Sequence, residues 1–154
     1  MPHRTSIAST FCVSTRFTLL ALSAISCYTC QMKSIVVIED NKDNRLLVRS
    51  LLSEFYAITE YETGFEAFRG LRNNVPDLIL LDISLPGMDG VEVLSQLRKD
   101  ERLKKIPVIA LTAHAVSGDR EQYLASGFND YIAKPIVDED AFVQAIERWL
   151  THTA

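Results

Sequence analysis

Three short runs of purely apolar residues recur at wide intervals along the chain. They occupy residues 35–38 (IVVI), 78–81 (LILL) and 108–111 (VIAL), and two weaker candidates lie at 58–61 and 131–133. Short apolar runs rich in β-branched residues are typical of strands that are buried on both faces, as in a parallel sheet covered by helices. The chain is therefore expected to build a parallel sheet.

Helical patterns separate these runs. An apolar stripe with the spacing i, i+3, i+4, i+7 occurs twice, in Val48, Leu51, Leu52 and Phe55 and in Phe142, Ala145, Ile146 and Trp149. Further helices are expected over residues 64–73, 90–99 and 115–126. The helix over 115–126 has the weakest apolar stripe, so it could move at a small cost in free energy. The alternation predicts one α/β domain over residues 32–154, a doubly wound five-stranded parallel sheet flanked by five helices.

Residues 1–31 differ in composition from the rest. They contain Arg4 and Arg16, no acidic residue, all three cysteines and an apolar stretch over 17–28. This pattern is similar to a secretory signal peptide, but the stretch is shorter than the roughly 20 residues that span a bilayer. Because Met32 leads directly into the first strand, we interpret residues 1–31 as a leader read from upstream of the true start. A signal segment is the alternative.

The net charge of residues 32–154 indicates which classes of molecule this part of the chain can bind. Residues 32–154 carry 14 basic and 20 acidic residues, a net charge of −6, because two of the chain's 16 basic residues lie before them. Direct binding to nucleic acid is not expected, since it requires a basic face. This part has no cysteine, which excludes a disulfide framework or a thiolate metal site. The absence of cysteine also suits a reducing compartment such as the cytoplasm.

Polar side chains follow four of the five expected strands. Glu39 and Asp40 follow the first strand, Asp82 the third, Thr112 the fourth and Lys134 the fifth. In open parallel sheets, ligands bind beyond the carboxyl ends of the strands, so these residues are expected to share one site.

Carboxylates gathered in one site repel one another. A like-charged pair at about 4 Å costs roughly 1 kcal/mol in water and about 4 kcal/mol at an effective dielectric of 20. A divalent cation removes this cost, and oxygen ligands without His or Cys favour Mg²⁺ over zinc. With the metal bound, a carboxylate can attack phosphorus and form an aspartyl phosphate. Lys134 would neutralise phosphoryl oxygens, and Thr112 would donate a hydrogen bond to them.

Several ordered motifs carry a family resemblance. They are Glu39-Asp40, the segment LLDISLPGMDG over residues 80–90, Leu111-Thr112-Ala113, and Tyr131-Ile132-Ala133-Lys134-Pro135. Together they resemble response-regulator receiver domains, over residues 33–150. The resemblance implies a flavodoxin-like sheet with strand order 2-1-3-4-5.

The resemblance also implies a role for each residue of the metal site. Asp82 is then the phosphoacceptor and a ligand of Mg²⁺. Asp40 binds the metal directly, Glu39 binds it through water, and the backbone carbonyl of Ser84 completes the protein ligands.

Signal transmission is implied in the same way. Lys134 contacts the phosphoryl group, and its bond to Pro135 is cis. Thr112 moves towards the phosphoryl group and Tyr131 turns inward, so that the helix over 115–126 shifts with the last strand and helix.

The partners implied by the resemblance are proteins. The expected function is that of a cytoplasmic single-domain response regulator, phosphorylated by a histidine kinase or a histidine phosphotransfer protein and acting on a downstream protein, with no membrane contact. Asn44, Leu47 and Ile136 are placed near the face that docks the donor.

Two other functions are compatible with parts of the pattern. A phosphohydrolase of the haloacid dehalogenase type also uses a strand-end Asp, a Thr, a Lys and Mg²⁺, but it needs a second Asp at the position of Ser84. A degenerate receiver that serves only as an interaction module would lack key residues, and all of them are present here.

Overall fold

A computed structural model describes residues 32–113 and 119–152. The predicted leader over 1–31 and the first residues of the helix expected over 115–126 lie outside this part of the chain. No helix in the described part combines the length and the hydropathy that crossing a bilayer requires.

The described residues form a parallel sheet with strand order β2-β1-β3-β4-β5, as expected. The strands are β1 (Ser34–Ile38), β2 (Ala57–Tyr61), β3 (Leu78–Asp82), β4 (Val108–Thr112) and β5 (Asp130–Ala133). The helices are α1 (Lys42–Leu52), α2 (Gly64–Leu71), α3 (Gly90–Lys99), α4 (Asp119–Ala125) and α5 (Glu139–His152). Each strand is followed by a helix, which confirms the predicted doubly wound α/β architecture.

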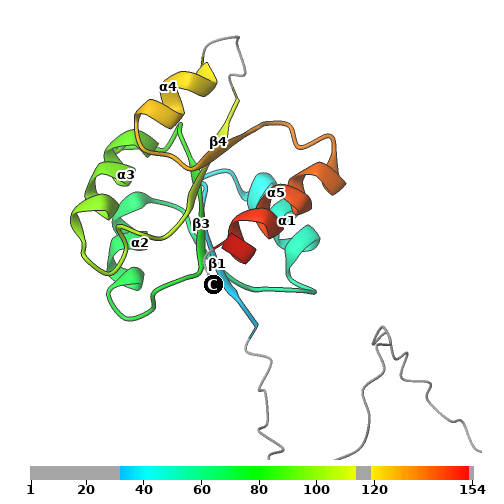
Figure 1. Ribbon diagram of the computed structural model, residues 1–154, viewed down its shortest axis with the longest axis horizontal. Helices are drawn as coiled ribbons and strands as arrows, with labels where there is room; N and C mark the ends of the chain where they lie inside the picture. Colours follow the sequence, from blue (N-terminus) through cyan, green and yellow to red (C-terminus); the bar gives the residue numbers. More distant parts are fainter. Residues whose placement is uncertain (1–31, 114–118, 153–154) are drawn as a thin grey trace, which may run out of the picture. The chain divides into compact units, whose positions relative to one another are not determined.

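Helices cover both faces of the sheet. In Figure 1, α1 and α5 lie on one face, and α2, α3 and α4 lie on the other. Successive side chains of β1 point to opposite faces of the sheet. Ile35 and Val37 pack with α1 and α5, whereas Val36 and Ile38 pack with α2 and α3. Burial on both faces is the reason why the central strands are apolar without alternation.

The strand register brings four carboxyl ends to one edge of the sheet. β1, β3, β4 and β5 are adjacent and parallel. Asp82 at the end of β3 lies opposite Leu111, and Thr112 at the end of β4 lies opposite Ala133. The residues that directly follow β1 and β5 therefore reach the same edge.

Two boundaries differ from the predicted helices. α1 ends at Leu52, and Phe55 is 60% exposed, so the prediction that Phe55 continues the apolar stripe was wrong. The backbone N–H groups of Phe55 and Tyr56 both donate to the carbonyl of Leu52. This turn directs Tyr56 towards the core in place of Phe55. α2 ends at Leu71, two residues before the predicted end.

Gly90 lets α3 begin directly beside the end of β3. A Cβ atom at Gly90 would lie 2.5 Å from the carbonyl oxygen of Asp82 and 2.8 Å from the Cα atom of Ile83. The Gly90 N–H donates to the Ile83 carbonyl over 2.9 Å, and the Asp89 side chain caps the helix at the N–H of Glu92. Both groups near the missing Cβ are backbone, so a side chain cannot be accommodated by rotamer changes alone.

Substitution of Gly90 by Ala should lower the free energy of unfolding by about 1–3 kcal/mol, because the added methyl group forces backbone apart next to Asp82. Urea unfolding followed by circular dichroism measures the change. Ser95→Ala, at an exposed position in the same helix, is the control and should be nearly neutral. Equal stability of the two variants would contradict the proposed close packing.

Candidate functional site

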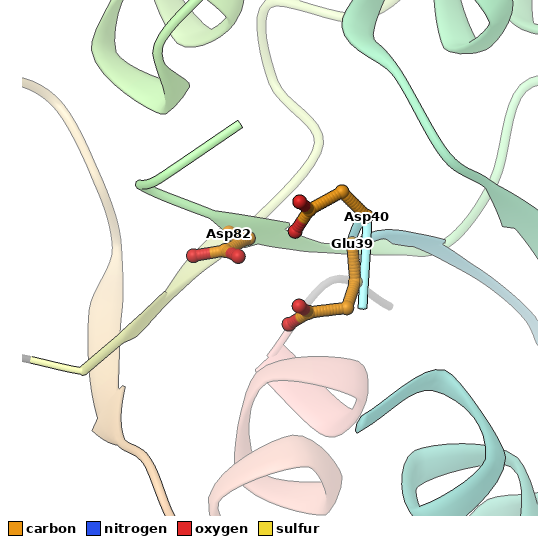
Figure 2. Close-up of side chains that lie close together, drawn as sticks. All are labelled: Glu39, Asp40 and Asp82. Atoms are coloured by element: carbon orange, nitrogen blue, oxygen red, sulfur yellow. The ribbon is translucent and has the colours of Figure 1, made fainter. Parts of the chain in front are cut away.

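Three carboxylates converge at the carboxyl edge of the sheet. Glu39 and Asp40 directly follow β1, and Asp82 is the last residue of β3. One carboxylate oxygen of each lies within 4.8 Å of the others, and Figure 2 shows the three side chains directed towards a common space. Glu39 and Asp82 are 0% and 1% exposed, whereas Asp40 is exposed. The cluster is therefore buried on one side and open to solvent on the Asp40 side.

Lys134 joins two of these carboxylates. Its Nζ atom donates to Asp82 Oδ2 over 2.8 Å and to Glu39 Oε2 over 3.0 Å. Burial lowers the pKa of Lys134, but the hydrogen bonds and charges of Asp82 and Glu39 outweigh burial and raise this pKa above its usual value. The side chain therefore stays an ammonium. The Lys134–Pro135 peptide bond is cis, as the resemblance implied.

Glu39 is the least solvated acid of the site. Burial raises its pKa, and the charge of Asp82 acts in the same direction. Hydrogen bonds from Asn44 and Lys134 oppose this effect, with Asn44 Nδ2 donating to Glu39 Oε1 over 3.1 Å. Asn44 thus supports the acidic cluster directly, a contact that the sequence alone did not indicate.

Arg45 holds the backbone of the acidic pair. The residue is only 9% exposed, and its Nη1 atom donates to the carbonyl oxygens of Glu39 and Asp40 over 2.7 and 2.9 Å. Asn41 caps α1 by accepting from the N–H groups of residues 43 and 44. The first turn of α1 therefore fixes the position from which both carboxylates project. Because guanidinium groups also serve surface ion pairs, the sequence carried no specific signal for this role.

The composition of the cluster suits Mg²⁺. With all groups ionised, three carboxylates and one ammonium leave a net charge of −2, which a divalent cation balances. Asp82 Oδ1 accepts the Ser84 N–H over 3.0 Å and Oδ2 accepts from Lys134. Each of these two Asp82 oxygens has a further lone pair available. Oxygen donors on a partly open surface are the ligands that Mg²⁺ prefers in proteins.

Thr112 lies at the same edge and is connected to α4. The residue is 1% exposed at the end of β4, and its Oγ1 atom lies 3.2 Å from the hydroxyl oxygen of Tyr123 in α4. The Tyr123 ring lies 6.5 Å from the ring of Tyr131 in β5 and 6.1 Å from that of Phe128. The structure thus places Thr112 and Tyr131 around Tyr123. Sequence reasoning missed Tyr123 because no local pattern places it next to Thr112.

Asp40→Asn should have opposite effects on folding and on metal binding. Loss of one negative charge relieves repulsion in the metal-free cluster, so the free energy of unfolding should rise by about 1 kcal/mol. The affinity for Mg²⁺ should fall, because a charged ligand is lost. Urea unfolding and isothermal titration calorimetry measure the two effects. Glu54→Gln, which removes an exposed charge outside the cluster, should change neither; unaltered Mg²⁺ affinity of Asp40→Asn would remove Asp40 from the metal site.

In the absence of Mg²⁺, the Glu39 carboxyl should make the free energy of unfolding depend on pH. Burial raises its pKa above the usual 4.5, so the folded protein keeps this proton to higher pH than the unfolded chain. The free energy of unfolding of the wild type minus that of Glu39→Gln should be largest and constant below a pH of about 4.5. This difference should decrease as the pH rises through the raised pKa. Denaturant unfolding of both proteins across this pH range tests the expectation, which a pH-independent difference would contradict.

Comparison with known proteins shows the family of this chain. A family model described as the response regulator receiver domain matches residues 35–147. The polar-differentiation response regulator DivK of Brucella ovis is 42% identical over 119 residues, which cover 77% of this chain and 96% of that relative. DivK of Brucella anthropi is 41% identical over the same shares of the two chains.

Solved structures show the same similarity. The receiver domain of the sensor histidine kinase PA1611 from Pseudomonas aeruginosa PAO1, with magnesium coordinated in its active-site cleft, has a TM-score of 0.71 and 35% identity and covers 78% of this chain and 98% of its own. The Mn²⁺-bound form of the response regulator Rcp1 has a TM-score of 0.65 and 32% identity, with coverage of 77% and 94%. Because the region matched to the family runs from β1 into α5 and contains every residue of the site, this chain belongs to the response regulator receiver domains.

Proposed function

We propose that this protein works as a single-domain response regulator and that Asp82 is its phosphoacceptor. The observation that carries the proposal is the environment of Asp82. Its carboxylate lies 2.8 Å from the Lys134 ammonium and within 4.8 Å of two further carboxylates. A nucleophile next to a cation and to oxygen ligands for a metal suits phosphoryl transfer, in which positioning and charge neutralisation supply most of the catalysis.

The proposed step forms one bond and breaks one bond. A carboxylate oxygen of Asp82 bonds to phosphorus while the bond from phosphorus to the donor's histidine nitrogen breaks, and the electron pair stays on that nitrogen. The Lys134 ammonium stabilises negative charge on the phosphoryl oxygens, and the Thr112 hydroxyl donates a hydrogen bond to one of them. Bound Mg²⁺ supplies further neutralisation of this charge.

The proposed protein ligands of the metal are Asp40, Asp82 and the backbone carbonyl of Ser84, with Glu39 acting through water. The convergence of the three carboxylates supports the roles of Asp40, Asp82 and Glu39. The hydrogen bond from the Ser84 N–H to Asp82 Oδ1 supports the role of the Ser84 carbonyl, because it keeps the backbone of Ser84 next to the cluster.

The proposed switch transmits phosphorylation through Thr112 to Tyr131 and α4. When the Thr112 hydroxyl turns towards the phosphoryl group, its contact with the Tyr123 hydroxyl is lost. Tyr131 then turns inward, and α4 shifts with β5 and α5. The contact of 3.2 Å between Thr112 and Tyr123 and the proximity of the two tyrosine rings support this coupling.

Membership of the receiver family implies a histidine kinase as a partner. We propose in addition that a histidine phosphotransfer protein can donate the phosphoryl group, that a downstream protein recognises the phosphorylated state, and that the protein acts in the cytoplasm without binding nucleic acid. Asn44, Leu47 and Ile136 line one small pocket together with Lys134. Their common position beside the site supports a role in docking the donor.

Asp82→Asn should abolish labelling by acetyl phosphate in the presence of Mg²⁺, because an amide cannot serve as the nucleophile. Mass spectrometry of the intact protein detects the phosphoryl adduct. Asp138→Asn is the matched control: this exposed residue accepts from the N–H of Ala141, and Asn can keep that contact. The control should label like the wild type, and full labelling of Asp82→Asn at another residue would refute the assignment.

A further inference from the structure

Helix α2 carries an aromatic and basic stripe that the phosphoacceptor site does not use. Phe65, Phe68, Arg69 and Arg72 recur at i, i+3, i+4 and i+7 along α2 and its C-cap. Residues at this spacing share one side of a helix. The buried residues of α2 occupy other positions and pack against the sheet, and Phe68 is partly buried against the same core. Phe65, Arg69 and Arg72 are exposed and are therefore available to a ligand.

This stripe lines a groove between α2 and α3, which lie on the same face of the sheet (Figure 1). The groove has a volume of about 480 Å³ and is also lined by Met88, Gln96 and Leu97. Phe65 is 58% exposed and leaves an aromatic ring accessible to solvent. The volume lies in the range of about 300–1,000 Å³ that is usual for ligand sites.

Two arginine side chains at this groove have no ion-pair partner among the described residues. Arg69 and Arg72 are exposed, and neither side chain has a hydrogen bond or ion pair with any residue in the described part of the chain. Of the neighbouring acids, Asp100 pairs with Arg102 over 2.7 Å. Glu66 accepts the backbone N–H of Glu62 over 3.2 Å and forms no ion pair with either arginine. Two unpaired cations next to aromatic surface favour a ligand that is both apolar and acidic.

We propose that the groove between α2 and α3 docks an acidic amphipathic helix of a protein partner. Large apolar side chains of this helix pack against Phe65 and Phe68, and its carboxylates pair with Arg69 and Arg72. This mode of recognition places one helix face in a hydrophobic groove, with anchors one turn apart.

The spacing of the groove residues suits a helix. The Cβ atoms of Arg69 and Arg72, three residues apart, are separated by about 5–6 Å, which is also the separation of the Cβ atoms of two residues one turn apart on a partner helix. The stripe extends over about 10 Å of helix axis. An antiparallel partner would place its first turn beside Arg72, and acidic residues are favoured in the first turn of a helix.

The experiment uses the ¹⁵N-labelled full chain and a synthetic helical peptide with two glutamates in its first turns and a tryptophan and a leucine in the following turns of the same face. Chemical shift perturbation should be confined to the residues that line the groove and their neighbours in α2, in the connection over 83–89, in α3 and in residues 100–103. A peptide with glutamine in place of glutamate should bind about tenfold more weakly, because two exposed ion pairs are lost. The double variant R69Q/R72Q should show the same loss.

The control variant R49Q/R148Q removes two other exposed arginines and should bind like the wild type. R69Q/R72Q should still be labelled by acetyl phosphate, so the outcome is independent of the phosphoacceptor assignment. The proposal is overturned if millimolar peptide causes no shifts or shifts elsewhere, or if R69Q/R72Q binds with unchanged affinity. Self-association of the chain through this groove, measured by sedimentation, would also overturn it, because a second copy would then be the occupant.

Discussion

The contact of Lys134 with Asp82 and Glu39 controls the electrostatics of the functional edge. Two carboxylates that are almost fully buried would each cost several kcal/mol if they were left without a partner. The ammonium, 2.8 Å from one and 3.0 Å from the other, offsets part of this cost. Asp40 adds a further negative charge, so the metal-free site keeps an excess that a divalent cation can balance. The proposed phosphorylation of Asp82 would change this charge balance.

This cluster depends on parallel strands that end together. The apolar residues of β1, β3 and β4 are buried on both faces, which holds their register in the core. The polar residues of the site come directly after these strands, at the carboxyl edge of the sheet, where the chain reaches solvent. Arg45 and Gly90 refine the arrangement, because Arg45 binds the backbone of the acidic pair and Gly90 lets α3 approach the end of β3.

The proposed functions are distributed over the two faces of the sheet. The small pocket of Asn44, Leu47 and Ile136 lies beside Lys134 and includes residues of α1. The contact of Thr112 with Tyr123 leads to α4 on the opposite face, where the α2–α3 groove also lies. The proposed donor docking therefore uses one face of the sheet, whereas the proposed signal output and helix docking use the other.

The sequence by itself determined the strands and the convergence of Glu39, Asp40, Asp82, Thr112 and Lys134. Both follow from local periodicity and from the rule that parallel strands present their carboxyl ends at one edge. The sheet order was implied by the family resemblance. The sequence placed Phe55 in an apolar stripe, because spacing alone does not reveal that the turn after Leu52 exchanges Phe55 for Tyr56. Only the tertiary structure decided which side chains meet across elements, such as Tyr123 with Thr112 and Asn44 with Glu39. It also decided that α2 and α3 enclose a groove. Such contacts depend on packing distances between segments far apart in the chain, which no local pattern encodes.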